Sequence, residues 1–107
     1  MTKTRALPAR LRIAGSDYAV VIAAVPEGIT AENRGMFDDA KLRITIDASS
    51  PLHLQRRTLL HEIIHAAGDL YGTAELTEDH VRALETGLWA IFNDNPGLAR
   101  TLFGPNV

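Results

Sequence analysis

Two histidines and a glutamate lie close together in the second half of the sequence, in the run His61-Glu62-Ile63-Ile64-His65. Because the histidines are four residues apart, an α-helix would place both imidazoles on one face, where they can reach a single ion. Glu62 would lie about 100° round the helix from His61, where it can accept a proton from a metal-bound water. This spacing predicts metal-assisted hydrolysis, in which zinc lowers the pKa of the water towards neutrality.

The composition limits what else could hold such a metal. The chain has 107 residues and no cysteine, which excludes thiolate zinc ligands, so histidines and carboxylates must supply the site. The formal net charge is −2 and the isoelectric point is about 6.0, without the basic excess typical of proteins that bind nucleic acid or anionic membranes. We therefore expect one domain, residues 1–107, a monomer or weak homodimer that binds neither nucleic acid nor a membrane. If the metal site is that of a hydrolase of the His-Glu-x-x-His type, its substrate is a peptide or protein.

No segment has the pattern of a membrane span or a secretory leader. The longest wholly apolar run, residues 19–25, is far too short to cross a bilayer. The basic residues near the N-terminus are not followed by the apolar segment that a secretory signal needs. We expect a cytoplasmic protein.

A β-hairpin is predicted near the start of the chain. Residues 11–13 and 18–25 have the apolar pattern of two short strands, and Gly15-Ser16-Asp17 between them favours a turn. The following residues, 26–39, are expected to form a polar loop that bends at Gly35.

A third strand is predicted at residues 41–47. Apolar and polar residues alternate strictly there, with Leu42, Ile44 and Ile46 on one face. This alternation indicates a half-buried strand, and its charged residues suggest an exposed sheet edge.

Two helices are predicted to follow. Ser49-Ser50-Pro51 is typical of a helix start, with a hydroxyl cap and a proline in the first turn, and predicts a helix from residue 52 to between residues 68 and 71. Thr77 is expected to cap a second helix, which ends at the turn-forming residues 93–97. A short apolar tail, residues 98–103, is expected to pack back on the core.

The third protein ligand must be a carboxylate. Asp69 lies on the same helix face as the histidines but about 9 Å along the axis, too far to share their ion. It is either a solvated surface acid or an acceptor that orients His65. On the second helix, Glu78 and Glu85 are about 10.5 Å apart, so only one of them can be the ligand. Helix geometry alone leaves both open.

The motif and the residues after it resemble a known family. Thr58-Leu-Leu-His-Glu-Ile-Ile-His-Ala66, Glu78-x-x-Val81-x-x-Leu84 and Asp94-Asn-Pro-Gly97 resemble minigluzincins, small zincin-like zinc peptidases encoded by phages and prophages. The resemblance covers roughly residues 40–98. It implies an α+β fold, in which a small antiparallel or mixed sheet of about three strands packs on an active-site helix and a second, ligand-bearing helix. It also implies that His61, His65 and Glu78 bind Zn²⁺.

The sequence departs from the pattern of larger, thermolysin-like gluzincins. Their longer spacing would select Glu85 as the ligand, and they have an aspartate four residues after it. Here Arg82 stands four residues after Glu78, and Trp89 four residues after Glu85. Glu85, or a two-histidine site completed by water, therefore stays an alternative to Glu78.

The resemblance implies a peptidase that hydrolyses peptide bonds with Glu62 as the general base. It also suggests that an extended peptide adds to the strand at residues 41–47, beside the metal, with a purely structural strand as the alternative. Two other functions stay open: a zinc-binding but catalytically idle phage regulatory protein, and a metal-free helical adapter.

Few side chains are available to stabilise the oxyanion that forms in peptide hydrolysis. Tyr18, Tyr71, His80 and Arg82 could do so, but nothing in the sequence places any of them over the metal. His53, like His80, is expected to be a surface residue.

Overall fold

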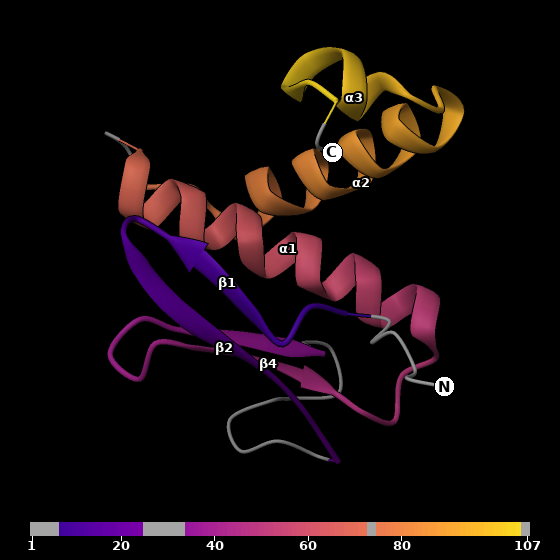
Figure 1. Ribbon diagram of the computed structural model, residues 1–107. Helices are drawn as coiled ribbons and strands as arrows, with labels where there is room; N and C mark the ends of the chain where they lie inside the picture. The colour runs from indigo at the N-terminus through magenta and orange to yellow at the C-terminus, as the bar shows by residue number, and fades with distance from the viewer. Residues whose placement is uncertain (1–6, 25–33, 73–74, 106–107) are drawn as a thin grey trace.

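The computed structural model describes residues 7–24, 34–72 and 75–105, and its architecture is α+β (Figure 1). Within these ranges, four strands form one mixed sheet and three helices follow it. The strands are β1 (Arg10–Ile13), β2 (Ser16–Ala23), β3 (Gly35–Asp38) and β4 (Arg43–Asp47), and the helices are α1 (Leu52–Tyr71), α2 (Glu78–Asp94) and α3 (Leu98–Phe103). The predicted fold class is confirmed, with one strand more than the three expected.

The first two strands form the predicted hairpin. They pair antiparallel and are joined by two residues, Ala14 and Gly15. Both residues have positive φ, 49° and 82°, as a type I′ turn requires, and the twist of this turn matches that of the strands. The predicted turn lay too far along the chain, because Ser16 and Asp17 already belong to β2. The predicted end of the second strand, residue 25, lies outside the described residues.

The strand predicted at the sheet edge is internal. The strand order is β1-β2-β4-β3, so β4 pairs parallel with β2 and antiparallel with β3. The edge strand is β3, which was predicted to be loop because four residues are too few to show an alternating pattern. Residues 26–33 of the predicted loop lie outside the described residues. Leu42 has a φ of 50° and precedes β4, so it does not share a face with Ile44 and Ile46.

The core lies between one face of the sheet and α1. Val20, Ile44 and Ile46 are buried there against Leu59 of α1 and against Leu7. Helix α1 packs on β3 and β4 with one side and on α2 with another, so the layers run sheet, α1, α2 (Figure 1). The middle of α1, which has the two motif histidines, is therefore enclosed from both sides.

The predicted helix boundaries agree with the structure, but one cap does not. Helix α1 ends at the last of the expected residues. Ser50 does not cap it, because its hydroxyl is buried and accepts a hydrogen bond from Arg34 at 3.3 Å, and Pro51 occupies the cap position. Thr77 caps α2 as predicted: its hydroxyl accepts from the backbone N–H of His80 at 3.1 Å, and its own N–H donates to the His80 ring.

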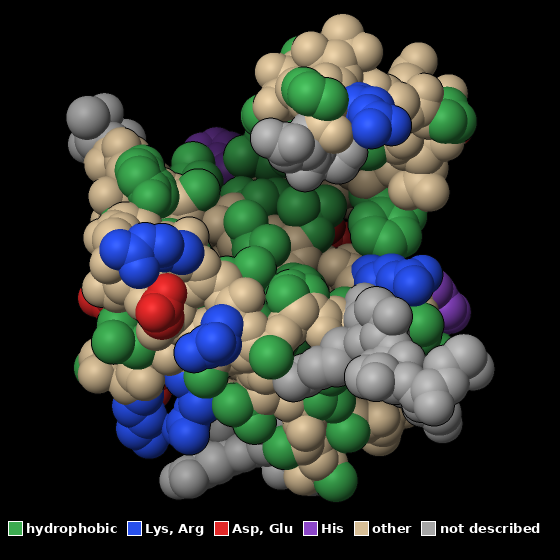
Figure 2. All heavy atoms as spheres, viewed as in Figure 1, with side chains coloured by type: hydrophobic (Ala, Val, Ile, Leu, Met, Phe, Trp, Pro, Cys, Tyr) green, Lys and Arg blue, Asp and Glu red, His purple; other side chains and the backbone are tan. Residues whose placement is uncertain are grey.

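The C-terminal tail does not pack back on the core as predicted. It forms α3, in which no residue is buried, and Leu102 and Phe103 are 58% and 68% exposed. Figure 2 shows hydrophobic side chains in the hollow between the C-terminal helices and the rest of the molecule. Among the described helices, however, none combines the length and hydropathy needed to span a membrane.

Candidate metal centre

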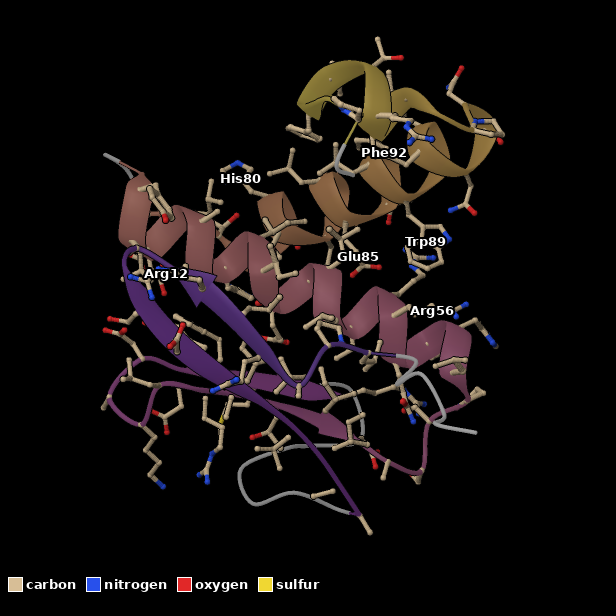
Figure 3. All side chains as sticks on the ribbon, viewed as in Figure 1. Arg12, Arg56, His80, Glu85, Trp89 and Phe92 are labelled. Atoms are coloured by element: carbon tan, nitrogen blue, oxygen red, sulfur yellow. The ribbon has the colours of Figure 1, made fainter. Side chains whose placement is uncertain are left out.

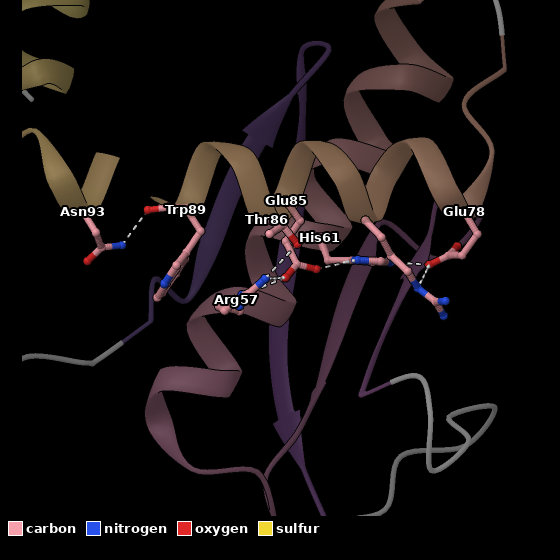
Figure 4. Close-up of polar contacts among 8 residues, drawn as sticks. Arg57, His61, Glu78, Glu85, Thr86, Trp89 and Asn93 are labelled. Atoms are coloured by element: carbon pink, nitrogen blue, oxygen red, sulfur yellow. Dashed lines mark hydrogen bonds and ion pairs between the residues drawn. The ribbon is translucent and has the colours of Figure 1, made fainter. Parts of the chain in front are cut away.

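The crossing of α1 and α2 brings the motif histidines against the first turn of α2. His61 Nε2 lies 2.6 Å from Glu78 Oε1 (Figure 4), and His65 Nε2 lies 3.0 Å from Glu78 Oε2. One nitrogen of each histidine and one carboxylate oxygen of Glu78 all lie within 4.8 Å of one another. These three residues therefore form a group that could hold a metal ion.

The donor set fits zinc. Two imidazoles and one carboxylate are a ligand set of catalytic zinc sites, in which a fourth position stays open. The two Glu78 oxygens lie 2.6 and 3.0 Å from the histidine nitrogens, and the three ligand atoms lie within 4.8 Å of one another, so small side-chain shifts would let all three reach one ion. The Glu78 side chain is 43% exposed, whereas those of His61 and His65 are 15% and 25% exposed. Water or a substrate oxygen can therefore approach from the side of Glu78.

The carboxylate of Glu85 contacts the other ring nitrogen of His61, Nδ1. Its Oε1 is 2.9 Å from His61 Nδ1, so it stands outside the group formed with Glu78 and cannot share its ion. Its Oε2 accepts from Arg57, at 2.8 Å from Nε and 2.5 Å from Nη2 (Figure 4). A carboxylate on the second ring nitrogen fixes the orientation and tautomer of a metal-binding histidine.

Sequence reasoning weighed Glu85 only as a ligand and missed this orienting position. Metal-binding histidines generally donate their other N–H to an acceptor. The sequence could therefore have indicated that one carboxylate orients His61 while another binds the metal. The spacing is compatible with this orienting role, because Glu85 follows Glu78 by about two helical turns and so lies on the same face of α2.

Of the two interpretations of Asp69, the structure agrees with the solvated acid and not with a partner of His65. It is exposed, and among the described residues no hydrogen bond joins it to His65, although both line the same hollow. The other two histidines, His53 and His80, are exposed as predicted. His80 in addition closes the capping box of α2.

Glu62 is buried beneath the histidines, with 6% of its surface exposed. The pKa of Glu62 is raised to about 7, chiefly by burial, against the lowering effect of His61 and of a hydrogen bond from the backbone N–H of Phe37. The charges of Glu78 and Glu85 add to the effect of burial. The Phe37 bond also ties the carboxylate to the edge strand β3. Glu62 is thus held beside the histidines and is poised to exchange a proton near neutral pH.

Two hollows meet at His61 and Glu62. One, of about 310 Å³, extends towards the first half of α1, and the other, of about 220 Å³, extends along β3. The second is lined by Gly35, Met36, Phe37, His61, Glu62, His65, Asp69 and Glu78. A ligand that fills both hollows would cross the metal centre.

Of the four side chains considered for the oxyanion, only Arg82 lies at the site, with Nε 3.8 Å from Glu78 Oε1. Tyr18 is buried and its hydroxyl donates to Asp39, which raises the pKa of Tyr18 to about 12. The hydroxyl of Tyr71 accepts from the backbone N–H of Ala14 at 2.6 Å. Both tyrosines therefore support the fold.

Comparison with known proteins returned no match: no family model, no curated protein and no solved structure is significantly similar to the chain.

Proposed function

We propose that this protein is a zinc-dependent metallopeptidase that hydrolyses peptide bonds with Glu62 as general base. The observation that supports this proposal most is the proximity of His61, His65 and Glu78, whose ligand atoms lie within 4.8 Å of one another. A buried carboxylate, that of Glu62, lies beside them where two hollows meet. The proposed metal ligands, the proposed general base and space for a substrate therefore lie in one place.

Each residue has a definite task in this mechanism. Zinc, when bound to His61, His65 and Glu78, would act as a Lewis acid and make water acidic enough to react near neutral pH. Glu62 removes the proton from the attacking water and then delivers it to the nitrogen of the leaving amine, a role worth about 10²- to 10⁴-fold in rate. Arg82 is the cation available to stabilise the negative charge that develops on the carbonyl oxygen.

The edge strand β3 offers a place for the substrate. The sequence suggested peptide addition at residues 41–47, but β4 is paired on both sides and has no free edge. Strand β3 is paired only with β4 in the described sheet, and its Gly35–Asp38 segment borders the hollow that contains His65 and Glu78. An extended peptide that pairs with β3 would lie beside the metal ligands.

The test is cleavage of a broad peptide library by the wild type and by Glu62→Gln. We expect Glu62→Gln to keep its zinc and its fold and to lose cleavage, because glutamine retains the size but not the basicity of glutamate. Glu75→Gln, at an exposed position, should cut as the wild type does. If the wild type and Glu62→Gln bind the same partner protein and neither cuts, the catalytically idle regulator is the better account.

A further inference from the structure

Three arginines converge on the larger hollow beside the metal centre. Arg34 precedes β3, Arg57 belongs to α1 and Arg82 to α2, and all three line the same space of about 310 Å³. This volume is at the lower end of ligand-binding sites, which span roughly 300–1,000 Å³. We call this space the arginine pocket. Its lining includes His61 and Glu62, so it opens directly onto the proposed reaction centre.

The charges of the arginine pocket favour an anion. Among the described residues of the lining, three guanidinium groups stand against two carboxylates, those of Glu62 and Glu85. Glu85 is already engaged, by Arg57 on one oxygen and by His61 on the other. The remaining guanidinium groups favour an anion, and in a peptidase site the anion at hand is a carboxylate of the peptide.

Two of the guanidinium groups are available to a ligand. Arg34 donates to the Ser50 hydroxyl at 3.3 Å, and no carboxylate among the described residues pairs with it. Arg82 lies 3.8 Å from Glu78 and its side chain is 56% exposed. Because this single contact is long and a guanidinium has five N–H donors, Arg82 keeps donors for a ligand carboxylate as well as for the carbonyl oxygen.

The third arginine is already held in place. Arg57 donates to Glu85, bonds to Thr86 Oγ1 at 3.3 Å, and stacks over the Trp89 ring with its central carbon 5.7 Å from the ring centroid. Figure 3 shows Glu85 and Trp89 on the side of α2 that faces α1. Because these contacts fix the guanidinium beforehand, a ligand loses little entropy in ordering it.

We propose that the arginine pocket binds a carboxylate of the substrate, so that the enzyme prefers peptides with a carboxylate beside the bond to be cut. The carboxylate is that of an aspartate or glutamate side chain or of the peptide C-terminus, and it lies next to the bond to be cut, because the pocket shares His61 and Glu62 with the metal centre. The described residues that line the smaller hollow include Asp69 and no arginine, so the two ends of the site differ in charge and orient the peptide. This inference rests on the proposed peptidase function and names its substrate class.

The test measures peptide binding through the change in fluorescence of Trp89, the single tryptophan in the chain. The protein is zinc-loaded Glu62→Gln, so that no peptide is cut during the titration. Three acetylated peptides of sequence Ala-Ala-X-Ala-Ala are compared: X is Glu with an amidated end, Gln with an amidated end, or Gln with a free C-terminal carboxylate. We expect at least one carboxylate peptide to bind about tenfold more tightly than the Gln amide, and the peptide that does so identifies the source of the carboxylate.

Arg34→Gln should remove most of this preference. Arg56→Gln is the matched control, because Arg56 is exposed on α1 and does not line the arginine pocket, and it should keep the preference. Equal binding of all three peptides, or a preference that Arg34→Gln leaves intact, would overturn the carboxylate site even if the wild type cuts peptides. Conversely, a preference that depends on Arg34 in a protein that never cuts would support this site and refute the peptidase function.

Discussion

The imidazole of His61 has a different carboxylate partner on each ring nitrogen. Nε2 faces Glu78 at 2.6 Å, and Nδ1 lies 2.9 Å from Glu85. If Nδ1–H donates to Glu85, Nε2 is left unprotonated, which is the form that a metal ligand must have. Arg57 holds Glu85 in turn. Glu78 and Glu85 therefore act on the same histidine in different ways, although both belong to α2.

This division of roles predicts a ranking of alanine variants by zinc affinity. Glu78→Ala should lose the most, because it removes a protein ligand. Glu85→Ala should weaken binding by about 10- to 100-fold, the usual effect of removing the partner that orients a ligating histidine. Asp79→Ala, beside Glu78 but exposed, should change little. Competition with a chromogenic chelator measures all three affinities, and a larger loss for Glu85→Ala than for Glu78→Ala would make Glu85 the ligand.

At the scale of elements, the sequence was informative where a pattern repeats over several turns or a cap is local. Apolar residues recur at helical spacing along α1, at Leu52, Leu59, Ile63, Ala66 and Leu70, and Thr77 caps α2. Both features predicted helices that the structure contains. Strand β3 was missed because it is a strand only through its pairing with β4. Arg43 suggested an edge for β4, yet it lies opposite Asp38 of β3 within the sheet.

The residues of the candidate site likewise differ in whether the sequence alone could predict them. The two histidines and Glu62 were predictable because one helix spaces them. The choice between Glu78 and Glu85 depends on how α1 crosses α2, and the arginine pocket depends on three segments that meet only in the folded chain. Sequence periodicity contains no information about either arrangement.

Gly35 lets β3 approach α1 closely enough for Phe37 to reach Glu62. A Cβ at this position would overlap the methyl group of Thr58 and lie 3.1 Å from the Thr45 carbonyl oxygen. We expect Gly35→Ala to destabilise the protein by about 1–3 kcal/mol, as overpacking does. Gly87→Ala is the control.

Gly87 lies on α2, where an added Cβ would meet nothing within 4 Å. Gly87→Ala should therefore stabilise the protein, by about 0.5–1 kcal/mol, through helix propensity alone. Urea unfolding of both variants measures the two free energies. A Gly35→Ala protein as stable as the wild type would show that β3 is not held against α1 as described.

Across the whole molecule, the layers are held together unequally. The sheet and α1 share the core, whereas among the described residues of α2 only Val81 is buried. Leu84 and Ile91 of α2 remain 43% and 49% exposed. Because the ligands come from both α1 and α2, a bound metal would tie the outer helix to the rest. Binding that is specific to the folded state would add about 4 kcal/mol to stability at a zinc concentration of roughly 1,000 times the dissociation constant.

The most direct test of this account is the metal content of the protein purified without added zinc. Elemental analysis should find about one zinc per chain in the wild type, as expected for a single site with three protein ligands. The double variant His61→Ala, His65→Ala should contain almost none while still folding around the core of the sheet and α1. Zinc content that is the same in both proteins, or a wild type that binds no zinc even when it is supplied, would contradict the metal centre and with it the proposed peptidase.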